Sequence, residues 1–373
     1  MKVSCTKSNL QTGLAITSHL STKNIQLPIL NNVLIVAKNG NIRLTSTNLE
    51  IAISCLIRGK VDEDGDITVP SKLFHDYISL LKEEKVDLWS EDQTLHVEAG
   101  DYKTKMNGLS SSDFPLVPSV TADKTFTVPV NSFREAMSQV VFAVANNEAR
   151  PELSGTLIRF NNGEITMVAT DSYRLAERKI KAASDYQNEV SVIIPARTMV
   201  EVNRVLSIFK DSVDSPSDVQ ISLSENQVVF NYGSVELISR TIEGSFPDYQ
   251  QIIPKSFQTE SKIDRDDLMN VVKTASLFSR SGLFDVTLSF DPSGFVKAAA
   301  ADATRGENTA STKAAVTGIE NSVTINFRYL LDGLQSMSTE EVVFKMIDGA
   351  NPCVVSPVGH EAEHLYIVMP IRQ

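Results

Sequence analysis

Two histidines stand four residues apart near the end of the chain, in the segment His360-Glu-Ala-Glu-His364, and this is the one spacing in the sequence that resembles a metal site. Residues four apart share one face of a helix or a strand, so weak metal binding is an alternative. Structural zinc usually takes four ligands, and these two histidines have no partners at a suitable spacing. We therefore interpret the segment as a polar turn before a last strand, and we expect no metal and no other cofactor.

The remaining reactive side chains do not form a recognisable catalytic motif. Cys5, Cys55 and Cys353 are far apart and include no Cys-x-x-Cys, which is typical of reduced thiols in a cytoplasmic protein. The sequence has no GxxxxGK[ST] phosphate loop, HExxH, GxSxG or GxGxxG, and no carboxylate pair stands out as an acid/base couple. These patterns favour a binding scaffold, with an enzyme that has a scattered active site as the alternative.

The bulk composition is that of a soluble globular protein. The chain has 373 residues, 42% hydrophobic and 22% charged, enough for two or three domains. We expect no signal peptide in MKVSCTKSNL and no membrane contact, since no apolar run approaches the roughly 20 residues that span a bilayer. The net charge of −11 argues against binding to nucleic acid, but it is an average over the chain. Whether one surface is basic depends on how the charges are distributed.

An internal repeat organises the chain. Three strand-like segments pass through a small polar step, at Thr47-Asn48, Thr170-Asp171 and Ala301-Asp302. A strand followed by a helix comes after each step, over 67–82, 193–210 and 323–337, and the first two copies carry Pro70 and Pro195 at the junction. Two similar Phe-Pro segments, over 111–120 and 244–254, have the character of connections between domains. Three landmarks in one order predict a tandem repeat.

Each repeat also begins with a short strand and an amphipathic helix. The middle copy shows the clearest helical stripe, at Phe133, Ala136, Met137, Val140, Val141 and Val144. Two helices packed on antiparallel sheets are the simplest arrangement for such a unit. The predicted fold class is therefore α+β, with three tandem copies over 1–122, 123–249 and 250–373.

The charges divide between helices and turns. Basic side chains occur on the polar sides of the predicted helices, whereas acidic residues gather in turns, for example over 62–64 and at Glu340-Glu341. Helices of this kind would offer a basic surface that contacts phosphates without reading sequence. Nothing in the sequence is typical of an element that reads bases.

Four strings in this chain make it similar to the bacterial sliding clamps, the beta subunits of DNA polymerase III. They are LPILNNVLI at 27–35, VATDSYRLA at 168–176, SFPDYQQIIP at 245–254 and LYIVMPIR at 365–372. The resemblance runs over the full length. It implies a DNA polymerase processivity factor in the cytoplasm, in which two subunits close head to tail into a ring of DNA-clamp domains around double-stranded DNA. It also implies a non-catalytic subunit.

The resemblance leads us to expect three groups of functional residues. For contact with DNA these are Lys23, Asn24, Lys72, Arg134, Arg197, Arg204 and Arg280. For ring closure they are Leu73, Tyr77, Leu81, Leu277 and Phe278. A pocket between the second and third domains would bind peptides from the replicative DNA polymerase, the clamp loader and other proteins, through Arg150, Glu152, Leu153, Thr170, Ser172, Tyr173, Arg174, Leu175, Pro247, Gln251, Ile252, Val368, Met369, Pro370, Ile371 and Arg372.

A few residues depart from the pattern of the family. Gln251 stands where many members have a basic residue, Gln373 ends a chain that often ends in an apolar residue, and Asn351-Pro352-Cys353 replaces a more typical Ser-Pro-Val. These positions bear on the rim of the pocket, so we expect them to affect the choice of peptide. A monomeric protein-interaction scaffold that never meets DNA is the remaining alternative.

Overall fold

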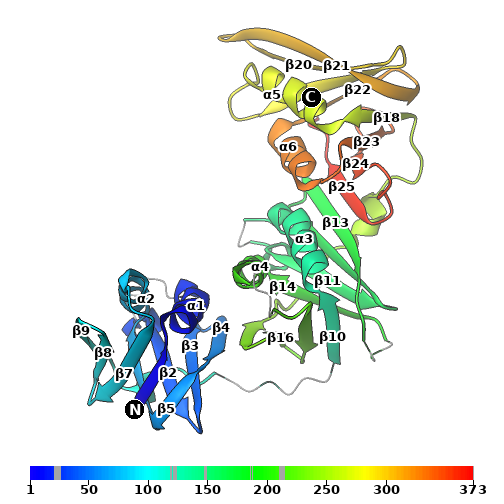
Figure 1. Cartoon of the computed structure of the whole chain (residues 1–373). Helices are drawn as coiled ribbons and strands as arrows, with labels where there is room; N and C mark the ends of the chain where they lie inside the picture. Colours follow the sequence, from blue (N-terminus) through cyan, green and yellow to red (C-terminus); the bar gives the residue numbers. More distant parts are fainter. Residues whose placement is uncertain are drawn as a thin grey trace. The chain divides into compact units, whose positions relative to one another are not determined.

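The structure, a computed structural model, describes residues 1–20, 27–117, 120, 124–146, 149–184, 186, 188–209 and 215–372. Along the chain, helices and strands follow one another in the same order three times (Figure 1). Each repeat runs strand, helix and three strands, and then strand, helix and three strands again. In the first repeat, the first half ends with one additional short strand, Gly59–Glu63.

The three repeats have closely matching elements. The first contains β1 (Lys2–Thr6), α1 (Lys7–Thr17), β2 (Asn32–Lys38), β3 (Asn41–Thr47), β4 (Ile51–Ile57), β5 (Gly59–Glu63), β6 (Gly65–Pro70), α2 (Ser71–Leu80), β7 (Lys85–Glu91), β8 (Thr94–Ala99) and β9 (Tyr102–Asn107). The second contains β10 (Lys124–Pro129), α3 (Val130–Val140), β11 (Gly155–Asn161), β12 (Glu164–Thr170), β13 (Arg174–Lys181), β14 (Val190–Pro195), α4 (Ala196–Ile208), β15 (Asp218–Leu223), β16 (Gln227–Tyr232) and β17 (Val235–Arg240). The third contains β18 (Thr259–Asp264), α5 (Arg265–Ser276), β19 (Asp285–Asp291), β20 (Phe295–Asp302), β21 (Gly306–Gly318), β22 (Asn321–Asn326), α6 (Phe327–Ser336), β23 (Glu341–Met346), β24 (Cys353–Pro357) and β25 (His364–Val368).

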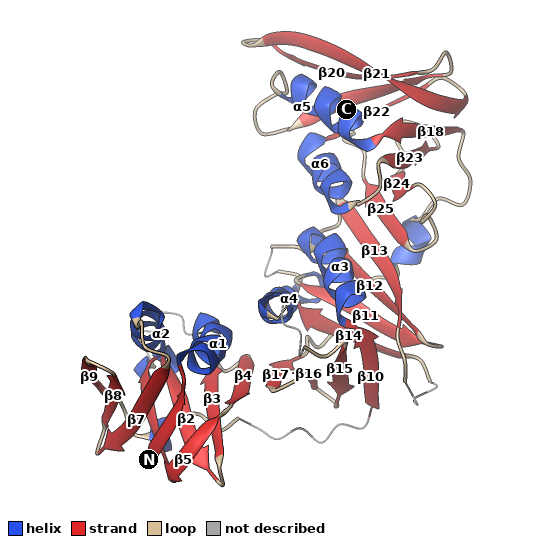
Figure 2. Ribbon diagram, in the orientation of Figure 1, coloured by secondary structure: helices blue, strands red, loops and turns tan. Residues whose placement is uncertain are grey.

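The chain forms two compact units, and the middle repeat contributes to both. The first unit contains Met1–Val130, Ala183–Tyr186 and Glu201–Thr241, and the second contains Asn131–Ala182, Gln187–Val200 and Ile242–Gln373. In the first unit a five-stranded sheet has the order β5-β1-β7-β8-β9, and an eight-stranded sheet has the order β10-β15-β16-β17-β4-β3-β2-β6. Helix α1 packs against α2 and against β4 in this unit (Figure 2).

The second unit is built on one twelve-stranded sheet. Its order is β14-β11-β12-β13-β25-β24-β23-β18-β21-β20-β19-β22, and neighbouring strands are antiparallel. Helix α5 packs against α6 and against β21. Strands β13 and β25 come from the second and third repeats, so one continuous sheet joins these two repeats.

The predicted helical stripes form the core. Phe133, Ala136, Met137 and Val140 of α3 are buried, and Leu10 and Leu14 of α1 are buried in the same way. The proline predicted at the strand-to-helix junction lies one residue before the first helical turn, because Pro70 is the N-cap residue of α2 and Pro195 ends β14. In the third repeat Asn326 takes this place, and its side chain accepts a hydrogen bond from the backbone N–H of Arg328.

The polar step in each repeat is a turn held by its own side chains. In the first repeat Asn48 accepts hydrogen bonds from two backbone N–H groups, and Leu49 adopts a positive φ of 75°. In the second repeat Asp171 accepts the equivalent pair, and Ser172 has a φ of 77°. This chemistry is that of an Asx turn. The predicted α+β fold, with three tandem copies of helices packed on antiparallel sheets, is confirmed.

Candidate functional site

A groove of about 210 Å³ lies where the second and third repeats meet in the twelve-stranded sheet. Four segments form it: the turn before β13, the short 3-10 helix Pro151–Leu153, the connector that contains the 3-10 helix Tyr249–Ile252, and the end of β25. Its lining residues are Arg150, Leu153, Thr170, Ser172, Arg174, Leu175, Pro247, Asp248, Tyr249, Ile252, Ile367 and Met369.

The structure brings together nine of the residues predicted for the peptide pocket: Arg150, Leu153, Thr170, Ser172, Arg174, Leu175, Pro247, Ile252 and Met369. They are far apart in the sequence and meet because β13 pairs with β25, which sets Arg174 opposite Val368 and Leu175 opposite Ile367. Backbone contacts fix this meeting point further, since the N–H of Met369 donates to the carbonyl of Tyr173 at 2.9 Å.

Val368 was predicted for the pocket and is not among the residues that line the groove. Successive side chains of a strand point to opposite faces. Ile367 and Met369 line the groove, whereas Val368 is fully buried and pairs with Cys353 on the neighbouring strand. From this stretch Val368, Met369, Pro370, Ile371 and Arg372 were predicted, and a strict alternation would have selected Ile367 in place of Val368.

Six other predicted residues lie near the groove without lining it. Glu152 pairs with Arg150, Gln251 donates to Asp248, and Tyr173 is exposed and stacks on Tyr329. After Met369 the chain turns toward β22, since the N–H of Ile371 donates to the carbonyl of Thr324. The residues after Met369 that the groove does not include are Pro370, Ile371 and Arg372. Gln373 lies outside the described residues.

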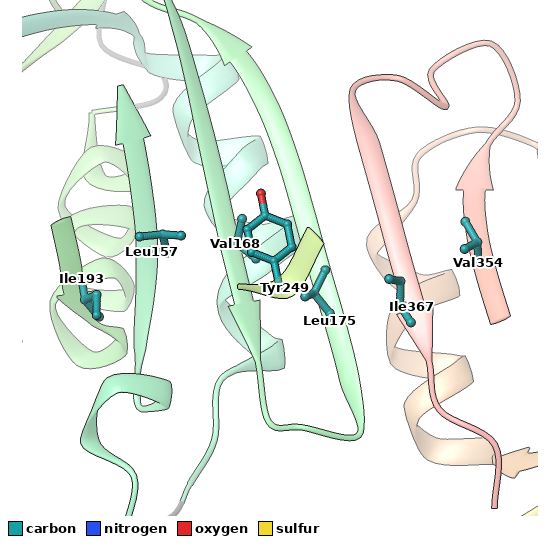
Figure 3. Packing of buried hydrophobic residues seen from close by; sticks show 7 residues of the cluster. All are labelled: Leu157, Val168, Leu175, Ile193, Tyr249, Val354 and Ile367. Atoms are coloured by element: carbon teal, nitrogen blue, oxygen red, sulfur yellow. The ribbon is translucent and has the colours of Figure 1, made fainter. Parts of the chain in front are cut away.

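Asp248, Tyr249 and Ile367 line the groove and were missed from the sequence. Tyr249 belongs to a buried apolar cluster with Leu157, Val168, Leu175, Ile193, Val354 and Ile367 (Figure 3). Its ring lies among strands of both repeats, and the connector that carries it covers the sheet there. A larger polar hollow of about 570 Å³ lies beyond Tyr249, lined in part by Arg159, Glu177 and Lys179, so this ring separates two cavities.

The two arginines of the groove differ in how they are held. The Nε atom of Arg150 donates to Glu152 at 3.1 Å, and about half of the Arg150 side chain is exposed. Arg174 is buried and donates to Asp171, to Asp332 and to the carbonyl of Phe142. Burial by itself disfavours its charge, but neighbouring groups, among them Tyr366, Asp332 and Asp171, raise the pKa of Arg174 above its ordinary value. Arg174 is therefore cationic at neutral pH.

The basic residues predicted for DNA contact fall into different environments. Lys72 at the start of α2 and Arg197 at the start of α4 are exposed, and Arg134 on α3 is half-buried. Lys23 and Asn24 lie outside the described residues. Exposed cations on helices fit the predicted type of surface for Lys72 and Arg197.

Arg204 was also predicted to contact DNA, and its guanidinium is engaged within the first unit. Its guanidinium donates to Glu201 and to the carbonyls of Ala15 and Ile16, in the last turn of α1, and the side chain is 24% exposed. A cation at the carboxyl end of a helix is favourable, because it meets unpaired carbonyls and the negative end of the helix dipole. Arg280 is also engaged, since its Nε donates to Asp285 at 2.8 Å.

The residues predicted for ring closure differ in their exposure. Leu81 is 3% exposed and belongs to the core of its own repeat. Its neighbour Leu80 is 78% exposed instead, because α2 ends at Leu80 and the chain turns there. Leu73 and Leu277 are exposed, and Tyr77 and Phe278 are half-buried.

Reactive side chains give no second candidate site within the described residues. The three cysteines are buried and unpaired, and burial raises the pKa of Cys5 and of Cys353 to about 12, which keeps these thiols protonated. His360 is exposed and His364 is buried, and no group of three or more histidine, cysteine or acidic side chains in the described part of the chain could hold a metal ion. None of the described helices is both long and apolar enough to cross a bilayer.

Comparisons with known proteins agree over the whole length. The N-terminal, central and C-terminal domains of the DNA polymerase III beta subunit match residues 1–118, 127–248 and 250–372. The beta sliding clamp of Synechococcus elongatus is 30% identical over 382 residues, which cover 100% of this chain and 99% of that one. The beta sliding clamp of Staphylococcus epidermidis is 29% identical over 93% of this chain and 92% of that one.

Solved structures give the same answer. The crystal structure of the DNA polymerase III subunit beta from Pseudomonas aeruginosa has a TM-score of 0.94 and 27% identity, and the match covers 100% of both chains. The Bacillus subtilis sliding clamp has a TM-score of 0.93 at 24% identity and covers 100% of this chain and 99% of that one, which shows the common fold. The chain belongs to the family of DNA polymerase III beta subunits, the bacterial sliding clamps.

Proposed function

We propose that the protein is a non-catalytic processivity factor whose two subunits close head to tail into a ring around double-stranded DNA. The observation that carries this proposal is the way the repeats join within one chain. The fourth strand of the first repeat, β4, pairs with the last strand of the second repeat, β17. In the same way, β13 of the second repeat pairs with β25, the last strand of the third.

The same rule leaves two strand edges without a partner from the described part of the chain. Strand β9, the last strand of the first repeat, has β8 as its one neighbour in the five-stranded sheet. Strand β21 pairs with β20 over 306–313 and with β18 over 314–318, so along 306–313 its second edge is open. Unpaired edges invite pairing with another chain. If β9 of one subunit pairs with β21 of another, the pattern of the two internal joints is repeated and a head-to-tail dimer closes.

Exposed apolar side chains flank both open edges and support this interface. Leu73 and Leu80 lie on α2 of the first repeat, and Leu277 follows α5 of the third. Tyr77 and Phe278 add half-buried rings, and Tyr102 on β9 is exposed. Burying such groups against another subunit would contribute roughly 25 cal/mol for each Å² of apolar surface removed from water.

For the DNA surface we propose Lys72 and Arg197, with Arg134 next to them in rank. A ring holds DNA by topology, so a few exposed cations on helices suffice, and their contacts to phosphates would be independent of base sequence. The net charge of −11 then fits a protein with acidic outer turns that discourage binding to other DNA. We also propose that Lys23 and Asn24 contact DNA.

We further propose that the groove between the second and third repeats binds short peptides of the replicative polymerase, the clamp loader and other partners. Leu153, Leu175 and Ile252 offer apolar contacts, and Arg150 and Thr170 offer polar groups at the rim. The variant Met369→Asp would place a charge in this groove and should abolish peptide binding while leaving the ring intact. A peptide affinity equal to that of the wild type would refute the location.

Retention on DNA tests the ring itself. The labelled protein is loaded with a clamp loader onto nicked circular DNA, and the DNA is then linearised. Retention on the circle and loss from the linear form are expected, because a ring that slides leaves through an end. Binding that does not change on linearisation would show ordinary surface attachment and overturn the proposal.

Two alternatives are separated by simple measurements. A monomeric protein-interaction scaffold predicts a single-chain mass in solution, and an enzyme with a scattered active site predicts turnover of a candidate substrate. We keep the domain limits 1–122, 123–249 and 250–373 as part of the proposal, together with a place in the cytoplasm, where bacterial DNA is replicated.

A further inference from the structure

Helix α6 of the third repeat places two side chains against the groove without lining it. Tyr329 and Asp332 are three residues apart, so they project from one face of the helix. Both reach Arg174, which belongs to the second repeat and lines the groove. Helix α6 therefore contributes to the groove through Arg174, although no pattern in the sequence of this helix indicates a role in binding.

The contacts of Arg174 account for every nitrogen of its guanidinium. Nε donates to Asp171 at 3.0 Å, Nη1 donates to Asp332 at 2.5 Å, and Nη2 donates to the carbonyl of Phe142 at 2.9 Å. The rings of Phe142 and Tyr329 lie 5.4 and 4.7 Å from the guanidinium carbon. The side chain is 11% exposed. A planar cation held in this way has one orientation.

The two carboxylates that hold Arg174 are not equivalent. Asp171 lies in the same turn as Arg174 and already accepts two backbone N–H groups there, so it fixes the turn. Asp332 comes from another repeat, is about half exposed, and within the described residues makes a side-chain hydrogen bond to Arg174 alone. Asp171 therefore holds Arg174 locally, and Asp332 joins it to the third repeat.

The position of α6 is itself fixed. The hydroxyl of Tyr366 on β25 donates to the backbone carbonyl of Tyr329 at 2.7 Å, and the ring of Tyr366 lies against Gly333. Strand β25 also carries the groove residue Ile367 and leads to Met369. Helix α6 and strand β25 are thus joined to each other. Strand β25 forms one wall of the groove, and α6 holds Arg174 on the other wall.

We propose that Asp332 is a positioning residue for partner binding: it holds the guanidinium of Arg174 at the groove and so makes peptide affinity depend on helix α6. The inference rests on the proposed role of the groove. Asp332 is not among the groove's lining residues, so its effect on a bound peptide passes through Arg174.

A double-mutant cycle tests this. Asp332→Asn, Arg174→Ala and the double variant are compared by fluorescence anisotropy, with a labelled synthetic peptide that carries the clamp-binding motif of the replicative polymerase. Asp332→Asn should weaken the Kd by roughly three- to tenfold, as expected for loss of a charge-assisted contact at a partly exposed site. In the Arg174→Ala background the same change should have no further effect, because the residue through which Asp332 acts is gone.

Matched variants separate positioning from general damage. Asp332→Glu keeps the carboxylate and should bind within about twofold of the wild type, and Asp266→Asn removes an exposed carboxylate on α5 that pairs with Arg265 and should bind as the wild type does. A wild-type Kd for Asp332→Asn, or additive losses in the cycle, would overturn the inference and leave the groove standing. Failure of the wild type to bind the peptide would instead overturn the groove, and this inference with it.

Discussion

The phenolic hydroxyl of Tyr249 donates a 2.5 Å hydrogen bond to the carboxylate of Glu177, and both side chains are buried. Tyr249 belongs to the connector and Glu177 to β13, so this bond fastens the connector to the sheet. Because Pro247 and Ile252 on the same connector line the groove, the bond also sets the position of that wall.

Tyr249→Phe should therefore weaken two properties together. It leaves a buried carboxylate without its donor, which costs roughly 1–3 kcal/mol in the free energy of unfolding. It should also weaken peptide binding by a few fold, because the connector loses its anchor. Urea denaturation and peptide anisotropy measure the two effects. Tyr232→Phe is the control, since its buried hydroxyl donates to the neutral carbonyl of Pro216 in the other unit. Peptide binding unaffected by Tyr249→Phe would contradict this role.

The parts of the fold that follow from local periodicity could be predicted from the sequence. Helical stripes such as Phe133 to Val140 marked the helices, and the Thr-Asn and Thr-Asp steps marked turns that the structure closes with side-chain hydrogen bonds. Contacts that depend on long-range pairing could not be predicted in this way. Arg204 was read as a solvent-exposed cation, and only the meeting of α4 with the last turn of α1 shows that its donors are engaged.

The groove was predicted in outline for a similar reason. The resemblance supplied the strings, but the choice between Ile367 and Val368 depends on strand register, which a one-residue error reverses. Asp332 had no local signal at all, because its partner Arg174 is 158 residues away in the sequence. Tyr249 could have been found, since an aromatic residue in a connector rich in apolar side chains indicates a segment that packs on the sheet.

Gly333→Ala should strongly destabilise the second unit. A Cβ at this position would lie 2.2 Å from a ring carbon of Tyr366, so either α6 or the buried ring has to move. Overpacking of this kind typically costs about 1–3 kcal/mol in the free energy of unfolding. The displaced helix should also lower peptide affinity, since α6 carries Asp332.

Chemical denaturation of Gly333→Ala, with peptide binding measured on the folded protein, checks this expectation. Gly282→Ala is a comparison in open space, although its positive φ of 85° adds backbone strain of its own. A Gly333→Ala variant as stable as the wild type would show that α6 can shift at little cost.

Protonation of His364 should destabilise the fold in mild acid. Burial lowers the pKa of His364 to about 4, with the charge of Arg178 acting in the same direction. The unfolded chain, with an ordinary histidine pKa of about 6.5, binds a proton between pH 6.5 and 4, whereas the folded state does not. Stability from this group is therefore complete above about pH 6.5 and is lost as the pH falls toward 4, by about 3 kcal/mol in all.

Urea denaturation at a series of pH values measures this loss. His364→Phe should remove most of the dependence between pH 6.5 and 4, because the ring keeps its bulk and can no longer be protonated. His360→Gln, at an exposed position, should keep the wild-type dependence. Identical pH profiles for the wild type and His364→Phe would assign the acid sensitivity to other groups.

Arg204→Ala should destabilise the first unit. Removing the guanidinium leaves Glu201 buried, with His19 at 2.7 Å as its remaining partner among the described residues, and takes a charged donor from the last carbonyls of α1. Loss of one partner of a buried charge costs roughly 3 kcal/mol. Arg197→Ala on the same helix removes an exposed cation and should leave stability unchanged while reducing the salt dependence of DNA binding. Equal stabilities of the two variants would contradict the structural role of Arg204 and favour its contact with DNA.

Leu277→Asp and Leu80→Asp should each convert the proposed dimer to monomers. Leu277 is 68% exposed and Leu80 is 78% exposed, and we propose that both belong to the interface between the two open edges. A charge there gains nothing inside a subunit and has to be desolvated when the interface forms, which disfavours association strongly. Sedimentation velocity gives the mass directly. Leu116→Asp is the matched control, because this leucine is 98% exposed in a connector and should leave the dimer intact. Monomers from Leu116→Asp, or dimers from both other variants, would move the interface away from these edges.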